Sequence, residues 1–432
     1  VLRRNPASPV RHLSLVLRGG SAAATLETAG WELLALRTMA RAGTKYDYKT
    51  IQDLLDSSSA SMGAGATLDY SSYSLTSLDK YFPLLLPIWA NTLVSPAFAQ
   101  EDFDQVLSDS KLALQSREKD PWQRTGLAMN AEFFAGHPYA PPAEGTKASL
   151  EAASLEAVKA WYATKFSADR IFVVASGDFD PGALQKDLEA ALGGIADRKA
   201  GPGAKPPRFS PAPASRLVKA EYAPTKGVAY VRGDFAAPSP ADPDFMATNL
   251  AMKMFSDLLF NVVRDKHGAV YSPSAYIRSF AANYGSITLF KTNVPGKVKA
   301  YVDEAAAEFA AGKVLATGAE ASGHGAAAAK DTAPRTTIEE ALEVYKAQYV
   351  NAYFEKLQTN SAVAGLIAQS VVSTGDCRSW LLDRDRINAV TAEGVRAAAA
   401  KYLFGQGITW VVLSSKDGLV PVVSADYEKL GK

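Results

Sequence analysis

Arg264 and Tyr271 are the two residues of this sequence whose types and spacing best suit binding or catalysis. Apolar residues recur at helical spacing over 255–263, which predicts a helix that carries Arg264 on its last turn. Gly268 favours the end of that helix because glycine adopts positive φ without strain, and a β-rich segment then begins at 269. A guanidinium and a phenol held close together can bind a peptide carbonyl or an oxyanion. Spacing alone leaves open a plainer alternative, an ordinary surface arginine at a helix C-cap.

The segment 255–273 resembles the second-domain motif of the pitrilysin/insulinase-type zinc peptidases, which include the mitochondrial processing peptidases. In that family a helix ending LRExxGLxY supplies an arginine and a tyrosine that bind substrate and stabilise the tetrahedral intermediate. Arg264 and Tyr271 fall on those two positions. The resemblance extends to three further segments, GHPYAPPAEGT at 136–146, the helix and strand at 155–180, and the helix at 242–255.

The zinc motif of that family is degenerate here. Active members carry HxxEH on a helix, with two histidine ligands and a glutamate base. Counted back from Gly43-Thr44, the same positions read Leu34-Ala35-Leu36-Arg37-Thr38, so the resemblance places an arginine where the base belongs. The third ligand, a glutamate, is replaced by Ala113. The sequence therefore predicts that this chain binds no catalytic zinc.

The remaining metal-ligating residues suggest no second site. The chain has four histidines and one cysteine, and no two of them have the short spacing of a local metal site. His12 lies in a strand-like run and is expected to be a partly exposed strand residue. His267 lies between Arg264 and Tyr271, so it could line the same cleft.

Composition limits the classes of partner. The 432 residues carry a net charge of +1, which gives no electrostatic reason to bind nucleic acid or an anionic membrane. No run approaches the ~18 consecutive apolar residues that a membrane span requires. The apolar fraction of 47% is enough for large cores.

A proline-rich segment divides the chain. We predict a first domain at 1–200, a linker at 201–214 and a second domain at 215–432. A helix followed by a β-rich strand occurs in both halves, at 155–177 and at 392–415, which indicates a duplicated unit. The predicted class is α+β, with two homologous domains, each a mainly antiparallel sheet backed by helices. The resemblance implies that they form half of a clamshell.

Two further segments carry predictions. The resemblance places residues 63–66 on an edge strand, where an extended peptide can add by main-chain hydrogen bonds, and an edge strand without that role is the alternative. Its residues are Gly63, Ala64, Gly65 and Ala66. The Gly/Ala-rich segment 316–335 is expected to be a mobile connector, with a functional lid as the alternative. Thr336 or Thr337, followed by Glu339 or Glu340, is expected to form a capping box for the next helix.

The resemblance implies a zinc-less subunit of a heteromeric metallopeptidase. Such a chain would bind no cofactor and would be inactive alone. It would supply Arg264 and Tyr271 to a homologous partner that holds Zn²⁺ and cleaves an unfolded peptide. The alternative is a structural or peptide-binding pseudopeptidase. Two-chain bacterial members of this family are often exported, so the resemblance implies a periplasmic location.

Overall fold

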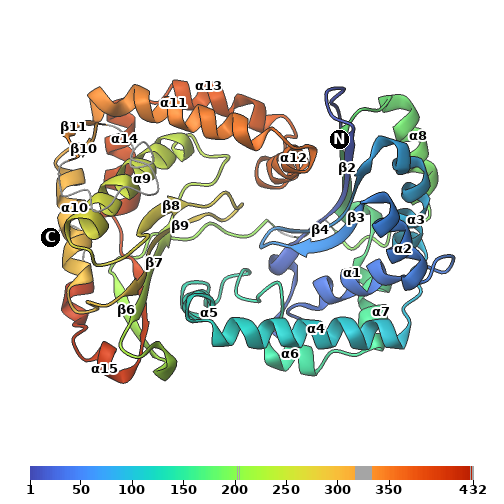
Figure 1. Ribbon diagram of the computed structural model, residues 1–432, viewed down its shortest axis with the longest axis horizontal. Coiled ribbons are helices and arrows are strands. Elements are labelled where there is room, and N and C mark those ends of the chain that lie inside the picture. The colour runs from blue at the N-terminus through green and yellow to red at the C-terminus, as the bar shows by residue number, and fades with distance from the viewer. Residues whose placement is uncertain (202, 204, 317–332, 429, 431–432) are drawn as a thin grey trace. The chain divides into compact units, whose positions relative to one another are not determined.

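The computed structural model describes residues 1–201, 203, 205–316, 333–428 and 430. The chain forms two compact units, each an open sheet backed by helices (Figure 1). The first unit contains residues 1–116, 136–206 and 355–380. The second contains residues 117–135, 207–354 and 381–432.

The first unit is built on a five-stranded sheet in the order β1-β5-β2-β4-β3. Its strands are β1 (Leu2–Arg4), β2 (Val10–Arg18), β3 (Ser61–Ala66), β4 (Tyr70–Leu78) and β5 (Ile171–Gly177). Only the β1–β5 pair is parallel. Leucines at alternate positions of β2 pack into one core, because successive side chains of a strand point to opposite faces. The helices are α1 (Trp31–Arg41), α2 (Tyr48–Ser58), α3 (Phe82–Val94), α4 (Gln100–Lys119), α6 (Lys147–Glu151), α7 (Leu155–Lys165) and α8 (Pro181–Leu192).

The second unit repeats this topology. Its sheet has the order β6-β12-β7-β9-β8, again with one parallel pair, β6–β12. The strands are β6 (Arg216–Glu221), β7 (Ala229–Ala236), β8 (Ser274–Ile277), β9 (Tyr284–Thr292) and β12 (Thr409–Ser414). The helices are α9 (Phe245–Phe260), α10 (Val298–Ala310), α11 (Ile338–Lys356), α13 (Asp383–Asn388), α14 (Ala392–Ala398) and α15 (Lys416–Leu419). The predicted pair of like α+β units is confirmed.

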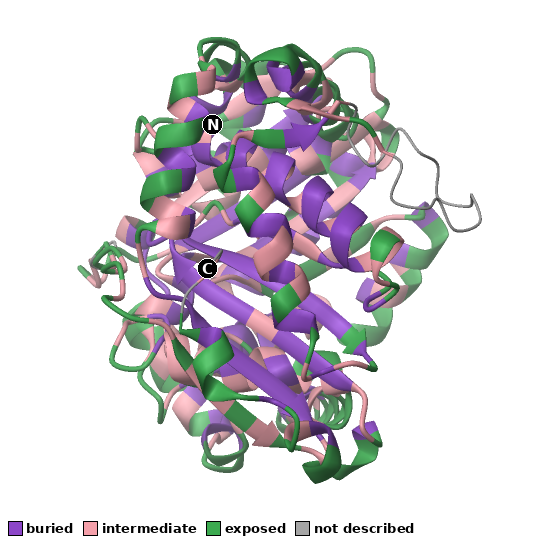
Figure 2. Cartoon of the chain, turned by 90° about the vertical axis from the view of Figure 1, so that its left-hand side faces the viewer, coloured by how far each residue is buried: buried purple, intermediate pink, exposed green. Residues whose placement is uncertain are grey.

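Burial in the second unit decreases from the centre of the sheet to its edge and to the outer turns. The central strands β7, β9 and β12 and the helix sides that face them are mostly buried, whereas the edge strand β6 and the outer turns are more exposed (Figure 2). A short hairpin, β10 (Lys313–Leu315) with β11 (Arg335–Thr337), leads into α11. The Thr337 hydroxyl accepts from the Glu340 amide and the Glu340 carboxylate accepts from the Thr337 amide, which is the predicted capping box. The predicted connector at 316–335 falls mostly outside the described residues.

Two helices are exchanged between the halves of the chain. Helix α5 (Pro121–Phe133) precedes the proline-rich segment but packs on β7 and β12 of the second unit. Helix α12 (Asn360–Thr374) follows that segment but packs on β2 and β5 of the first unit. The Asn360 amide donates to the Val10 carbonyl at 2.6 Å and accepts from the Ser176 hydroxyl at 2.9 Å. Each sheet is therefore completed by a helix from the other half of the sequence.

Candidate functional site

The segment that carries Arg264 continues α9 in an unusual form. Residues Asn261–Lys266 form a π-helix, a geometry that is frequent at functional sites. Gly268 ends it at φ 58°, and its amide donates to the Arg264 carbonyl at 2.8 Å. The predicted helix end at Gly268 is therefore confirmed.

Arg264 and Tyr271 lie against each other. The guanidinium carbon of Arg264 is 4.4 Å from the centroid of the Tyr271 ring and 4.6 Å from that of the Phe260 ring. Two cation–π contacts thus hold the guanidinium without using any of its N–H groups. Within the described part of the chain, the side chain of Arg264 makes no hydrogen bond and no ion pair. Tyr271 is 74% exposed, so the pair presents free donors to solvent.

The side chain of His267 contacts α10 and is not a free group next to Arg264. Its Nε2 lies 2.8 Å from the Glu304 carboxylate, and its ring stacks on Tyr301 at 3.8 Å between centroids. Lys266 donates to the same carboxylate at 2.7 Å. Partial burial opposes ionisation, but these two hydrogen bonds outweigh it and hold the pKa of Glu304 below its ordinary value. These contacts fix the turn that connects Arg264 to Tyr271.

The positions that correspond to the zinc motif are filled by packing. Leu34 and Ala35 are buried in a small apolar cluster with Phe103 and Val106 of α4. The Thr38 hydroxyl donates to the Leu34 carbonyl at 2.8 Å, inside the same helix. The zinc-motif positions on helix α1 therefore carry neither an imidazole nor a carboxylate that could bind zinc.

The other two positions confirm the mismatch. Ala113 lies exposed on α4 and carries no ligand atom, and Arg37 is half-buried and cannot act as a base near neutral pH. Among the described residues, no group of three or more histidine, cysteine, aspartate or glutamate side chains is placed to hold a metal ion. These residues do not fit the catalytic zinc of the family.

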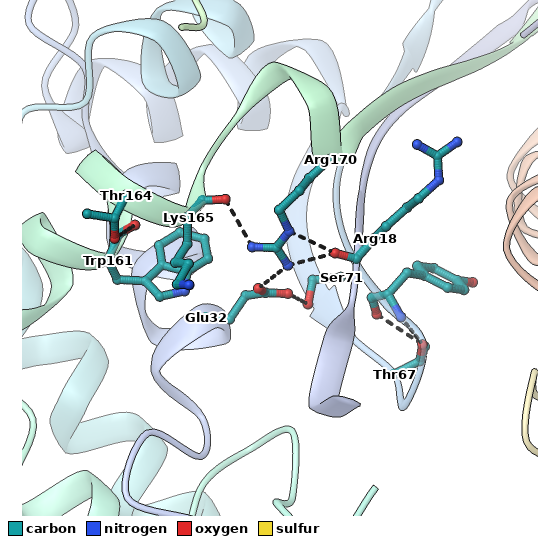
Figure 3. Close-up of polar contacts among 9 residues, drawn as sticks. Arg18, Glu32, Thr67, Ser71, Trp161, Thr164, Lys165 and Arg170 are labelled. Atoms are coloured by element: carbon teal, nitrogen blue, oxygen red, sulfur yellow. Dashed lines mark hydrogen bonds and ion pairs between the residues drawn. The ribbon is translucent and has the colours of Figure 1, made fainter. Parts of the chain in front are cut away.

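A buried ion pair holds α1 in place instead (Figure 3). Arg170 donates to the Glu32 carboxylate at 3.1 Å and to the Arg18 carbonyl at 2.6 Å, and the Ser71 hydroxyl donates to Glu32 at 2.6 Å. Burial raises the pKa of Glu32, although Arg170 and Ser71 oppose the shift. The side chain of Arg170 is only 4% exposed. No local pattern in the sequence indicates this pair, because its members are 138 residues apart.

The predicted edge strand is β3, and β4 is its one partner among the strands that the structure describes. Its residues alternate between exposed and half-buried, and a Cβ added at Gly63 would meet nothing within 4 Å. Half of the main-chain donors and acceptors of an edge strand point away from its sheet. The main chain of Gly63, Ala64, Gly65 and Ala66 is thus open to approach.

His12 is not the partly exposed residue that the sequence suggested. It is only 9% exposed, and its Nδ1 lies 2.8 Å from the Thr76 hydroxyl on the neighbouring strand β4. Burial lowers the pKa of His12 to about 4. The prediction failed because an alternating strand pattern does not show that the polar face of the sheet is also covered, here by α12.

Two models of one protein family match the chain. The model described as Insulinase (Peptidase family M16) matches residues 1–147, and the one described as Peptidase M16 inactive domain matches residues 152–313. Together the two ranges cover more than half of the chain. The chain belongs to peptidase family M16, as a member without the zinc ligands.

Individual relatives agree with this assignment. A protein of Helicobacter pylori described as non-peptidase homolog YmxG is 24% identical over 200 residues, and the match spans 46% of each chain. The chain thus aligns with about half the length of that relative.

Solved structures share the fold over nearly the whole chain. A peptidase M16 inactive domain from Pseudomonas fluorescens superposes with a TM-score of 0.80 at 17% identity, covering 96% of this chain and 95% of that one. A chain of complex III2 from Candida albicans gives 0.77 at 16% identity, over 98% and 94%. The periplasmic protease PqqL from Escherichia coli gives 0.72 at 15% identity, over 96% of this chain and 44% of that chain.

Proposed function

We propose that this chain is the zinc-less subunit of a heteromeric metallopeptidase and binds an extended peptide for a homologous subunit that carries HxxEH. Arg264 holds a carbonyl of the bound peptide, and Tyr271 donates a hydrogen bond to the oxygen on which negative charge develops. A donor of this kind is worth about 3 kcal/mol of transition-state stabilisation. Activation of water belongs to the partner, because no group at the zinc positions of this chain can perform it.

One observation carries the proposal. The Arg264 guanidinium is held by two aromatic rings, and within the described residues it forms no ion pair with a carboxylate. The aromatic contacts position this guanidinium and keep its donors free beside an exposed tyrosine, where they can bind a carbonyl. The open edge of β3 adds a second place for the peptide main chain.

A purely structural or peptide-binding role is the second candidate. The relative described as a non-peptidase homolog and the similar chain of complex III2 favour it. For the location we propose the periplasm, where the similar PqqL protease is found. Within the described residues, no helix has both the length and the apolar character needed to cross a membrane.

A co-purification experiment tests the proposal. The tagged chain is recovered from its native extract, its partners are identified, and peptide cleavage is measured with and without a zinc chelator. We expect an HxxEH homologue and chelator-sensitive cleavage that Arg264→Ala abolishes. Arg124→Ala is the matched control, because Arg124 also stacks on a tyrosine, Tyr222, at 4.6 Å. Recovery of the chain alone, or cleavage that survives Arg264→Ala, contradicts the half-enzyme role and favours the second candidate.

A further inference from the structure

The second sheet has one apolar face and one face with a polar centre. Val231, Ile287 and Leu289 point to the helices and form the core. Because successive side chains of a strand alternate, Arg232 and Asp234 of β7 point to the opposite face. Helix α5 covers part of this polar face, since a Cβ added at Gly126 would lie 3.5 Å from Arg232 Nη1.

The two charges on β7 neutralise each other. Arg232 donates through Nε and Nη2 to the two carboxylate oxygens of Asp234, at 2.8 and 2.6 Å. This bidentate pair is strong and leaves little charge for a ligand. Asp234 is fully buried and its oxygens are both engaged, so its repulsion of an incoming anion is largely cancelled by Arg232.

A second arginine on this face has no acidic partner in the part of the chain that the structure describes. Arg278, directly after β8, donates through Nη2 to the Tyr276 hydroxyl at 3.0 Å. Its guanidinium carbon lies 4.6 Å from the centroid of the Tyr276 ring and 6.0 Å from that of the Tyr284 ring. Arg278 forms no ion pair with any described residue, and its buried Nε has no hydrogen-bond acceptor.

Ser286 adds a further unused donor at the same place. In the register of the sheet it lies between Asp234 on β7 and Tyr276 on β8. It is 0% exposed, and its hydroxyl has no partner among the described residues. A buried hydroxyl without a partner is unfavourable, so an unused one needs an explanation.

We infer that Arg278, Ser286 and Tyr276 form a binding site for a carboxylate group on the polar face of the second sheet. The cluster offers one uncompensated positive charge and several donors, which matches a monoanion with two acceptor oxygens. A phosphate dianion would exceed the available charge, and a cation would find no free carboxylate among the described residues of this face. The carboxylate comes from a peptide, either its C-terminus or an acidic side chain. That ligand class rests on the proposed function, whereas the residues of the site are separate from Arg264 and Tyr271.

Calorimetry with four forms of one short extended peptide tests this site. The peptide has a free or an amidated C-terminus and carries Glu or Gln at one internal position. We expect the form with the recognised carboxylate to bind the wild-type chain about tenfold more tightly than its neutral counterpart. A preference for the free C-terminus over the amide identifies the terminal carboxylate as the ligand, and a preference for Glu over Gln identifies the side-chain carboxylate. Equal affinity of all four forms, or no binding of any, overturns the inference.

Three variants assign the effect to these residues. Arg278→Gln is expected to abolish the tenfold preference and Ser286→Ala to reduce it, with folding of each checked by circular dichroism. Arg124→Gln, which makes the same change in net charge on α5, is expected to leave the preference intact. If Arg124→Gln removes it equally, or if neither site variant changes it, the assignment is wrong. Arg264→Ala separates the two proposals, because the carboxylate preference should persist there even if the metallopeptidase role fails.

Discussion

Acidification should destabilise the folded chain through His12. Burial lowers the pKa of His12 from 6.5 to about 4 in the folded state. Between these two values the unfolded chain binds a proton that the folded chain does not. The contribution of neutral, buried His12 to the unfolding free energy is therefore fully present above pH 6.5 and is lost as the pH falls toward 4. A difference of ~2.5 pKa units corresponds to about 3 kcal/mol of unfolding free energy.

Chemical denaturation measured across that pH range checks this value. His12→Asn keeps a polar group that can reach Thr76 but does not titrate, so it should remove about 3 kcal/mol of the pH dependence. The acidic residues titrate in both proteins, so the difference between them isolates His12. Identical slopes for the wild type and His12→Asn would refute the assignment.

Three further predictions concern binding and stability. Arg264→Ala should weaken peptide binding about 10–100-fold, and equal peptide affinity by calorimetry would contradict this. The same variant should change the unfolding free energy by only ~1 kcal/mol, because the side chain makes two aromatic contacts and no ion pair with a described residue. Arg170→Met should cost about 3–5 kcal/mol in denaturant unfolding, because Glu32 is left buried without its partner; a loss below ~1 kcal/mol would show that the pair is not structural. The purified chain, equilibrated with zinc and then dialysed, should retain far less than one zinc per chain by emission spectrometry, and a full equivalent would contradict the mismatch at the zinc positions.

The sequence predicted the features that depend on neighbouring residues. The helix end at Gly268 follows from glycine after an amphipathic run, and the lost zinc motif follows from the residue types at 34–38 and 113. The capping box at Thr337 and Glu340 is likewise local. The duplicated topology was predictable because the same helix-and-strand order occurs twice along the chain.

Features that depend on tertiary contacts could not be predicted. The burial of His12 requires α12, which lies about 350 residues later, and the Glu32–Arg170 pair joins residues 138 apart. The sequence placed Arg264 and Tyr271 near each other but gave no sign that Phe260 also contacts the guanidinium. The cluster around Arg278 depends on strand register, which no single segment specifies.

The exchange of α5 and α12 constrains how this protein is made. During synthesis the first unit cannot be completed until residues 355–380 have left the ribosome, although its sheet is finished by Gly177. The hydrogen bonds of the Val10 carbonyl and the Ser176 hydroxyl to Asn360 cannot form until α12 has been synthesised. Neither half produced alone, by a stop codon or by a cut in the proline-rich segment, contains all parts of its own unit. The shortest continuous segment that contains all parts of one unit is therefore 1–380 for the first unit and 117–432 for the second.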